Sequence, residues 1–396
     1  MFVETKMQKV AVSNIAKQIR GVSYKPVDLH NDLNKDSVIL LRANNISDGK
    51  INFDDVVYVD KKKVSSEQYL QKGDILICAS SGSKNLVGKA ASVSFDIKCT
   101  FGAFCKVIRP ISKYANYLGM YFQSNIYRRI ISNVAIGANI NNIRNEHIDS
   151  LELSIYSDDK NNEIVSLLDT LQSIITHRRT QLEKLDLLVK ARFVEMFGDV
   201  INNTKRWKIY LFSEITISRL GKMLDKKSQT GKSKLPYLAN FNVQWFQFKL
   251  NNLNMMDFNE KEQIEFSLED DDLLVCEGGE IGRCAIWHNE ITPCYFQKAL
   301  HRVRCNKSII IPIYLAWWFK FNCDNNGFSE IEGAKATIAH LPGAKLKKLP
   351  IAVPPLNLQT QFADFVKQVD QSKSILQQEL DKAQMLFDSL MQEYFG

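Results

Sequence analysis

The sequence predicts an α+β protein built as a pseudo-twofold tandem repeat, in which each of two β-rich α/β modules is followed by a long helix. Three observations predict this fold: the chain resembles itself at about half its length, two heptad-patterned stretches recur at the same offset, and short β-type runs fill the rest. The 396 residues are 45% hydrophobic and 24% charged, as in a folded chain of several domains. We expect modules at 1–156 and 201–356, and helices at 157–200 and 357–396.

The internal repeat is clearest in one glycine-bearing segment. GDILICASSG at 73–82 matches DDLLVCEGGE at 271–280, an offset of 198. The other matched pairs are Gly21 with Gly221, Gly137 with Gly333, and Phe197 with Phe395. These pairs fall near the start, in the middle and at the end of each half of the chain. The pattern therefore indicates a tandem duplication and not a short-period solenoid.

Two stretches carry apolar residues at alternating spacings of four and three, which is typical of a coiled-coil seam. The expected seam residues are Leu168, Leu171, Ile175, Leu182, Leu185, Val189, Val366, Val369, Leu376, Leu380, Phe387 and Leu390. Ser157 precedes acidic residues at the start of the first helix, and Asn357 follows two prolines at the start of the second, so both are expected caps. Each seam is too long for one module to cover, so we expect the helices to pack on each other; the alternative is that each covers its own module.

Three seam positions are basic: Arg178, Arg192 and Lys373. Polar residues in a seam often set its register, so these are candidate register residues. The alternative is that their long side chains reach solvent beside the seam.

Positive charge is concentrated in the modules. Residues 1–156 hold 21 basic and 14 acidic residues, and residues 201–356 hold 21 and 16. The helices are slightly acidic, with 6 basic and 8 acidic residues at 157–200 and 3 and 6 at 357–396. This distribution favours modules that bind a polyanion, although incidental surface charge gives the same totals.

Several classes of protein are disfavoured by what the sequence lacks. It has no apolar run of about 20 residues for a membrane span, and its N-terminus does not resemble a secretory signal, so we expect a cytoplasmic protein without membrane partners. The eight cysteines form no CxxC pair and lie mostly in apolar β-type runs, so we expect buried thiols. The six histidines show no HExxH or HxH spacing, so no metal site is expected.

The sequence also lacks a recognisable active site. GGEIG at 278–282 leads into the strand-like RCAIWH and not into a helix, which disfavours a phosphate or cofactor loop. EDDD at 269–272 shares one of its four carboxylates with the matching QKGD at 71–74, so we interpret it as a solvated turn before a strand. No nucleophile elbow surrounds Ser80–Ser83. We therefore predict a non-catalytic chain that binds no cofactor of its own.

Polar, mostly glycine-bearing loops recur at three matching places in the modules, at 41–46, 80–89 and 137–144 and again at 238–242, 277–283 and 333–340. Arg and Asn side chains suit base edges, and glycine lets the backbone approach a phosphate. Arg128 and Arg129, on an amphipathic helix, are expected phosphate contacts. Framework positions are shared while loop residues differ, as expected of two readers of different DNA sequences.

The candidate DNA-contacting residues of the first module are Arg42, Asn44, Asn45, Ser81, Ser83, Lys84, Asn85, Lys89, Arg128, Arg129, Asn139, Asn141, Asn142 and Arg144. Those of the second module are Asn240, Asn242, Gly279, Arg283, Lys298, Lys335, Thr337, His340 and Lys345.

The chain resembles the specificity subunit of Type I restriction–modification systems. The resemblance rests on ARFVEMFGD at 191–199, LPIAVPPLNLQTQFADFV at 349–366, the paired strand-and-glycine segments, and Gly-Ala at 137–138 and 333–334. It implies two target-recognition domains that each read one half of a split double-stranded DNA site. It further implies that the two helices form an antiparallel coiled coil that spaces the readers.

The resemblance also implies separate methyltransferase and restriction/translocase subunits, which would bind S-adenosylmethionine and ATP. The sequence departs from a symmetric repeat in places: Glu277 and Glu280 of the second module match Ala79 and Gly82 of the first. Base preferences are therefore not transferred from the family.

Two other readings of the sequence remain open. A self-contained restriction–methylation enzyme would need the catalytic motifs that are missing here. A scaffold that binds only proteins is disfavoured by the basic modules and the Arg- and Asn-rich loops. DNA binding that weakens steeply with salt would separate the scaffold from a DNA reader.

Overall fold

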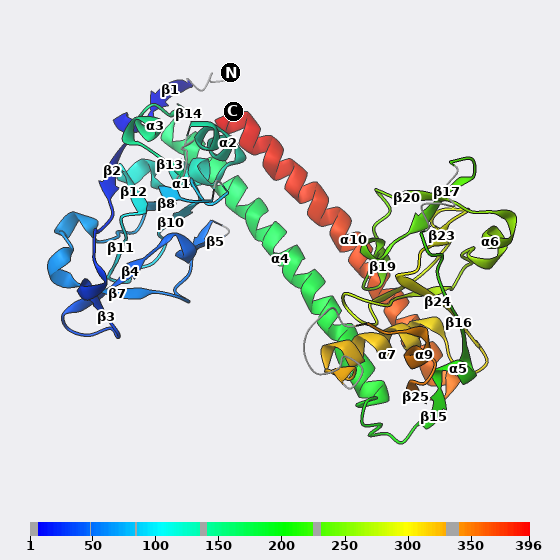
Figure 1. Cartoon of the computed structure of the whole chain (residues 1–396). Helices are drawn as coiled ribbons and strands as arrows, with labels where there is room; N and C mark the ends of the chain where they lie inside the picture. Colours follow the sequence, from blue (N-terminus) through cyan, green and yellow to red (C-terminus); the bar gives the residue numbers. More distant parts are fainter. Residues whose placement is uncertain (1–6, 48, 84, 135–140, 225–230, 330–339) are drawn as a thin grey trace. The chain divides into compact units, whose positions relative to one another are not determined.

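The computed structural model describes residues 1–396 except 1–6, 48, 84, 135–140, 225–230 and 330–339 (Figure 1). It divides into two compact units. Unit 1 contains residues 1–180 and 377–396, and unit 2 contains residues 181–376. Each unit therefore holds one β-rich body together with parts of both long helices.

Unit 1 is built around two four-stranded sheets, with strand orders β10-β8-β12-β2 and β11-β4-β7-β3. Its strands are β1 (Gln8–Ala11), β2 (Ala16–Arg20), β3 (Leu29–His30), β4 (Ser37–Leu41), β5 (Ile46–Ser47), β6 (Lys50–Ile51), β7 (Val57–Asp60), β8 (Ile75–Cys78), β9 (Ser80–Ser81), β10 (Ala90–Ser92), β11 (Cys99–Phe101), β12 (Cys105–Pro110), β13 (Asn141–Asn142) and β14 (Glu152–Ile155). Its short helices are α1 (Ala115–Gln123), α2 (Asn125–Val134) and α3 (Asn145–Asp149). The apolar residues of β8 and β12 lie in the middle of the first sheet, where both faces are covered.

Unit 2 repeats this plan, because its sheet β16-β24-β21-β22 matches β2-β12-β8-β10 of unit 1, and the pair β15-β25 matches β1-β14. Its strands are β15 (Lys208–Leu211), β16 (Thr216–Leu220), β17 (Lys234–Leu238), β18 (Val243–Gln244), β19 (Gln247–Phe248), β20 (Asn254–Asp257), β21 (Leu273–Cys276), β22 (Cys284–Ile286), β23 (Tyr295–Phe296), β24 (Leu300–Cys305) and β25 (Pro350–Val353). Its short helices are α5 (Phe212–Ile215), α6 (Glu260–Glu265), α7 (Pro312–Asp324) and α9 (Gly343–Leu346). The structure thus confirms the tandem repeat of mixed α/β bodies.

The two long helices, α4 (Asp158–Phe197) and α10 (Leu356–Phe395), each have 40 residues. They run antiparallel within each unit. In unit 1 the start of α4 shares a core with the end of α10, which includes Leu168 and Met391. In unit 2 the end of α4 shares a core with the start of α10, which includes Val189 and Val366. The helices pack on each other, as expected from the sequence, and both also pack on the body of each unit.

The predicted seam residues are withdrawn from solvent to different degrees. Leu168, Leu171, Ile175, Val189, Val366, Val369 and Leu380 are buried, whereas Leu182, Leu185, Leu376, Phe387 and Leu390 are half-buried. Arg178 pairs with Glu379 at 2.9 Å in unit 1, and Lys373 pairs with Asp186 at 2.6 Å in unit 2. Both pairs connect α4 to α10, so these two basic seam residues join the helices.

Each helix ends on an aromatic cluster that has the same form in both units. In unit 1, Phe395 at the end of α10 packs 4.9 Å from the ring of Tyr117, whose hydroxyl donates to the Ser154 carbonyl at 2.8 Å. In unit 2, Phe197 at the end of α4 packs 4.9 Å from Tyr314, whose hydroxyl donates to the carbonyl of residue 352. Figure 1 shows the red end of α10 beside α1 and α2. The C-terminal end of α10 therefore packs on the body of unit 1, and the C-terminal end of α4 packs on the body of unit 2.

A buried amide at the start of each long helix fixes the strand that precedes it. The Asn161 side chain donates to the Tyr156 carbonyl at 3.1 Å and accepts from the Tyr156 N–H at 3.2 Å. Gln359, at the offset of 198, is 0% exposed and donates to the Pro354 carbonyl at 2.8 Å. The expected cap Asn357 is wrong, because α10 already begins at Leu356 and Gln359 makes the fixing contacts.

The aspartates matched by the repeat are buried in both units. Asp74 is 1% exposed and accepts two hydrogen bonds from Arg109, each 2.7 Å long. Asp272 is also 1% exposed and accepts from Arg304 at 2.7 and 3.2 Å. The interpretation of EDDD as a wholly solvated turn is therefore wrong for Asp272. The aspartate shared by the two halves is therefore structural: its buried charge is stabilised by an arginine in each unit.

The cysteines confirm the sequence expectation. Six of the eight are buried, all eight are free thiols, and burial raises the pKa of the Cys99 and Cys294 thiols to about 12. The thiols of Cys99 and Cys294 are therefore protonated and unreactive near neutral pH. Among the described residues, no helix combines the length and apolar character that crossing a membrane requires.

Candidate nucleic-acid interface

A tight turn with closely matching backbone bonds lies beside the predicted loops in both units. In unit 1, between β11 and β12, the Ala103 N–H donates to the Val22 carbonyl at 3.0 Å. The Phe104 carbonyl accepts from the N–H groups of Ala79 at 2.9 Å and Ser80 at 3.0 Å. Backbone bonds on both sides leave the turn little freedom, so it presents its side chains rigidly.

In unit 2 the same turn lies between β23 and β24. The Lys298 N–H donates to the Lys222 carbonyl at 2.9 Å, and the Ala299 carbonyl accepts from the Glu277 N–H at 3.0 Å. Lys298 and Ala299 are therefore the structural counterparts of Ala103 and Phe104. The two bodies share the backbone of this turn and differ in the side chains that it carries.

Close approach to this turn explains two matched glycines. A Cβ on Gly21 would lie 2.1 Å from the Gly102 carbonyl oxygen, and a Cβ on Gly221 would lie 2.3 Å from the Gln297 carbonyl oxygen. Any side chain there would push the turn away from the neighbouring strand. The repeat of Gly21 and Gly221 in the sequence thus reflects a packing requirement.

The first predicted loop contains an asparagine that is structural in both units. Asn45 and Asn242 are both 0% exposed. Asn45 accepts from the Arg42 N–H at 2.8 Å, and Asn242 accepts from the Ala239 N–H at 2.9 Å and donates to the Lys249 carbonyl at 2.8 Å. The prediction that these two residues contact DNA is wrong: their amide groups hold the loop from inside.

The second and third predicted loops lie side by side in each unit. In unit 1, β9 pairs with β13, and the Ser80 hydroxyl donates to the Asn142 side chain at 2.6 Å. In unit 2, Gly278 forms an antiparallel bridge with His340, and the Leu341 N–H donates to the Glu277 carbonyl at 2.6 Å. Segments about 60 residues apart in the sequence therefore form one surface in each body.

In unit 1, a pocket of about 460 Å³ lies between the first loop, the turn at 102–105 and Ser80 of the second loop. Arg42 and Asn44 line it and share one carboxylate, because both donate to Asp55 Oδ2 at 2.8 Å. Phe104 and Tyr24 also line it, and Phe104 is 68% exposed. Sequence reasoning missed both aromatic residues; a signal for Phe104 was its place in a turn between two buried strands.

In unit 2, polar groups of the corresponding surface bond to one another. Arg283 donates to the Asn240 side-chain oxygen at 2.8 Å, and Asn240 donates to the Gly278 carbonyl at 2.7 Å. The Trp245 indole N–H donates to Glu280 at 2.6 Å. Gly279 takes a φ of +81°, a backbone conformation that favours glycine, beside Asn240. Asn240 and Arg283 thus brace the second loop, which limits what they can offer to DNA.

Other predicted contacts of unit 1 divide into braces and exposed groups. Arg128 donates to the carbonyls of Val87 and Asn85, so it clamps the second loop. Ser81 accepts from the Ser83 N–H at 3.1 Å, and Lys89 is half-buried. The exposed predicted residues are Ser83, Asn85, Arg129, Asn142 and Arg144, and Arg144 pairs with Glu146 at 3.4 Å.

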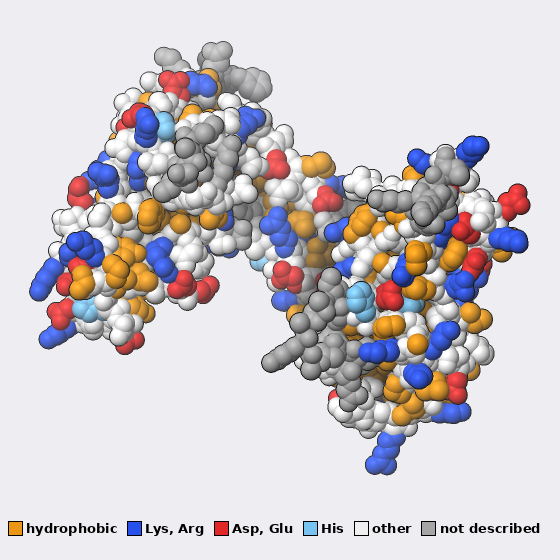
Figure 2. All heavy atoms as spheres, viewed as in Figure 1, with side chains coloured by type: hydrophobic (Ala, Val, Ile, Leu, Met, Phe, Trp, Pro, Cys, Tyr) orange, Lys and Arg blue, Asp and Glu red, His pale blue; other side chains and the backbone are white. Residues whose placement is uncertain are grey.

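In unit 2 the exposed predicted residues are Gly279, Lys298, His340 and Lys345. Lys84, Asn139, Lys335 and Thr337 lie outside the described residues, and for Asn141 the backbone alone is described. On the face seen in Figure 2, Lys and Arg side chains are interspersed with Asp and Glu over both units. Basic and acidic side chains are therefore mixed on this face.

A basic residue anchors the third loop from the same strand position in both units. On β12, Lys106 donates to the Asn145 side chain at 2.6 Å; on β24, His301 lies 3.0 Å from the Leu341 carbonyl. Burial is the largest influence on both groups, and it lowers the pKa of Lys106 and the pKa of His301. A neutral His301 can still donate one N–H to Leu341.

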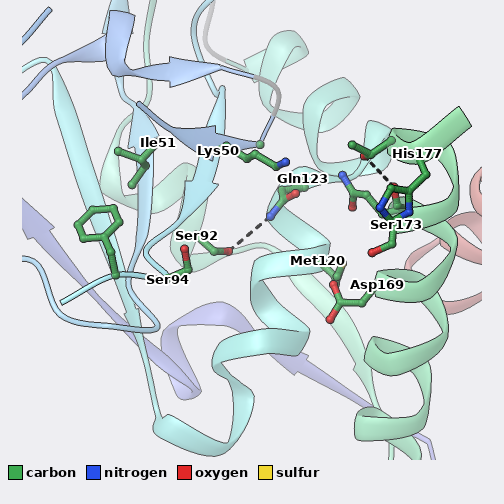
Figure 3. Close-up of a pocket in the computed structure, with 13 residues that line it drawn as sticks. Lys50, Ile51, Ser92, Ser94, Met120, Gln123, Asp169, Ser173 and His177 are labelled. Carbon is green, nitrogen blue, oxygen red and sulfur yellow. Dashed lines mark hydrogen bonds between the residues drawn. The ribbon is translucent and has the colours of Figure 1, made fainter. Parts of the chain in front are cut away.

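A second pocket of unit 1, of about 510 Å³, lies between the β5–β6 hairpin, α1 and α4 (Figure 3). Lys50 enters it from the hairpin, Gln123 from α1 and Asp169 from α4, and burial raises the pKa of Asp169. Of the predicted DNA-contacting residues that the structure describes, none lines it. This pocket is distinct from the loop surface described above.

Comparisons with known proteins agree on the kind of protein that this chain resembles. It matches the Type I restriction modification DNA specificity domain twice, over residues 12–186 and 204–385. It is 27% identical to the Type I restriction enzyme EcoKI specificity subunit of Escherichia coli K12, over 96% of this chain and 86% of that protein. It is 30% identical to the StySPI specificity subunit of Salmonella potsdam, over 67% of this chain and 59% of that one.

Two solved structures share the fold. One is the Type I restriction–modification S subunit from M. genitalium, with a TM-score of 0.57, 14% identity, and 99% of this chain and 97% of that chain covered. The other comes from a study of complex assembly and conformational transition in the type I system. Its TM-score is 0.62 at 13% identity, with 100% and 98% of the two chains covered.

Proposed function

Because the chain belongs to the Type I restriction modification DNA specificity family, we propose that each of its two bodies binds one half of a split double-stranded DNA site. The chain is a specificity subunit, and the recognition surface proposed in each body is the loop cluster around the shared turn. The observation that carries this proposal is that one backbone framework presents different exposed side chains in the two bodies. Such a design suits two readers of unlike sequences.

The local chemistry supports DNA as the ligand. Arg42 and Asn44 lie together at the pocket of unit 1, and Lys298 and His340 are exposed around the matching surface of unit 2. Arg recognises guanine and Asn recognises adenine in the major groove, while Lys and backbone N–H groups suit phosphates. We expect exposed cations to fix the position of the DNA and the loop side chains to select its bases.

We further propose that the chain lacks catalysis and works with methyltransferase and restriction/translocase subunits that bind S-adenosylmethionine and ATP. Leu187 and Leu188 on α4 are 62% and 47% exposed, and their repeat partners Met385 and Leu386 on α10 are 66% and 50% exposed. Adjacent exposed apolar side chains at matching places on two helices favour protein contacts. We infer that methyltransferase subunits dock on these two equivalent pairs.

The most direct test is a map of methylated sites in genomic DNA from cells that express this chain with its partner subunits. We expect a motif of two short half-sites separated by unread base pairs. A continuous motif would contradict two independent readers. Purified chain that transfers methyl groups without a partner would contradict the proposed absence of catalysis.

The helices supply a second test. We expect that inserting four residues between 165 and 190 changes the number of unread base pairs and leaves both half-site sequences unchanged, because a helix lengthens by about 1.5 Å per residue. The same methylation map measures this change. Unaltered spacing in an active complex would contradict the role of the helices as a spacer.

A further inference from the structure

Phe104 combines a fixed backbone with an exposed aromatic side chain. Its carbonyl accepts two backbone hydrogen bonds, from Ala79 and Ser80, and its side chain is 68% exposed. An exposed Phe is costly to hydrate, and this one is not on a loose loop. A rigidly held apolar side chain at the centre of a binding surface fits a contact that is completed by a ligand.

The groups around Phe104 identify the chemistry of that ligand. Tyr24, Ala43 and Ala103 supply the apolar lining of the same pocket, and Arg42 and Asn44 supply polar donors at its edge. Asp55 holds both donors, at 2.8 Å from each. The site therefore offers an apolar patch beside groups that hydrogen-bond base edges.

In the major groove, the apolar group of a base pair is the C5-methyl of thymine, and Phe is among the side chains that contact it. On the basis of the function proposed above, we propose that Phe104 recognises a thymine methyl group in the half-site read by unit 1. The donors beside it would then read a neighbouring base.

The second body sharpens this assignment. The turn has matching backbone bonds there, apart from the one that Ser80 donates in unit 1, but Ala299 occupies the place of Phe104 and the exposed Lys298 occupies the place of Ala103. A framework role would require a similar side chain in both turns. The difference makes this position a determinant of half-site preference, with a methyl contact in unit 1 and no equivalent aromatic contact from this turn in unit 2.

The test uses the full chain in its assembled complex and duplexes that contain its mapped split site. Each thymine of the half-site read by unit 1 is replaced in turn by uracil, which removes the methyl group alone. We expect one replacement to weaken binding by about fourfold, the value of one buried methyl-sized group. The F104A complex should bind unsubstituted DNA more weakly and should lose its sensitivity to that replacement.

F241A is the matched control, because Phe241 is an exposed phenylalanine of the first loop in unit 2. That variant should keep the full uracil effect in the half-site of unit 1. The proposal is overturned if no thymine is sensitive, if F104A retains the sensitivity, or if that half-site contains G·C pairs only. Failure of the wild-type complex to select any split site would instead contradict the proposed function itself.

Discussion

The two bodies carry a matching turn, the same buried Asp–Arg pair and the same internal asparagine, but the polar side chains of their recognition surfaces are bonded differently. In unit 1, Arg42 and Asn44 converge on the exposed carboxylate of Asp55 at the edge of a pocket. In unit 2, Arg283 and Asn240 bond to each other below the second loop. The first body thus braces its second loop with Arg128 and also places Arg42 at the pocket, whereas Arg283 of the second body is a brace.

This difference indicates that framework and recognition residues can be separated by burial and bonding within a repeat. Asp74 and Asp272 are equivalent in identity, burial and partner, which marks them as framework. Phe104 and Ala299 are equivalent in backbone alone. Positions of the second kind are the ones where we expect half-site preference to change without loss of the fold.

The largest effect is expected from removing the shared carboxylates. D74A should destabilise unit 1 by about 3–5 kcal/mol, because it leaves the mostly buried Arg109 without its carboxylate partner. D272A should destabilise unit 2 by less, because Arg304 is more exposed and keeps its pair with Glu269 at 2.8 Å. Hydrogen exchange measured by mass spectrometry would locate the loss in the mutated unit. The exposed Asp55 is the control, and D55A should leave the exchange of the core strands unchanged. A larger loss in unit 2 than in unit 1 would contradict this order.

The next largest effect concerns the matched apolar pairs on the long helices. We expect the double variant L187D/L188D to weaken binding of a methyltransferase subunit by at least about 2 kcal/mol, roughly 30-fold, because charged groups would be buried in the contact. The variant M385D/L386D should do the same at the equivalent place. Co-purification with measured stoichiometry checks both variants. Full retention of the partner by both would remove these residues from the interface.

Arg42 and Arg283 should differ in their effect on recognition. R42A is expected to cost about 1–3 kcal/mol of discrimination at one base of the first half-site, because a displayed guanidinium reads a base edge. R283A should instead lower the protection of the second loop against hydrogen exchange, since that arginine braces Asn240. Binding titrations with single base substitutions measure the first effect. Equal loss of discrimination from both variants would break the contrast between the two surfaces.

Lys106 and His301 hold the third loop in units 1 and 2. Because the anchor in unit 2 is a histidine, we expect the stability of unit 2 to depend on pH in the acidic range. Burial holds the pKa of His301 below its ordinary value of 6.5, so the folded state favours the neutral ring. The unfolded chain binds a proton as the pH falls below 6.5, so this residue costs stability from there down to the folded pKa, by at most about 1.4 kcal/mol per pH unit. H301Q should reduce that acid sensitivity relative to wild type when thermal unfolding is followed across this range. An unchanged slope would contradict it.

Much of the architecture follows from patterns that local chemistry makes visible. The heptads at 164–196 and their copies 198 residues later mark the two helices, because an apolar seam of that length is typical of paired long helices. Gly21 and Gly221 repeat because a side chain there would collide with a backbone carbonyl. These features depend on spacing and on residue size, and both are present in the sequence.

The recognition surface was harder to predict, because burial decides the role of a polar residue. Asn44 and Asn45 are neighbours of the same type, yet Asn44 lines the pocket and Asn45 is 0% exposed and bonded inside the loop. Arg128 has the residue type of a phosphate contact and instead clamps the loop carbonyls. Phe104 was missed because an aromatic residue after a buried strand is more often part of the core.

The smallest effect is expected from the ion pairs that join α4 to α10. R178A removes the pair with Glu379 in unit 1, and K373A removes the pair with Asp186 in unit 2. All four side chains are about one third exposed or more, so each pair should contribute about 0–1 kcal/mol, less at high salt. If the pairs instead set the register of the helices, the variants should alter the spacing of the methylated half-sites while stability hardly changes. If the methylation map of R178A/K373A shows wild-type spacing, the two residues do not set the register. Their role would then be a small contribution to stability.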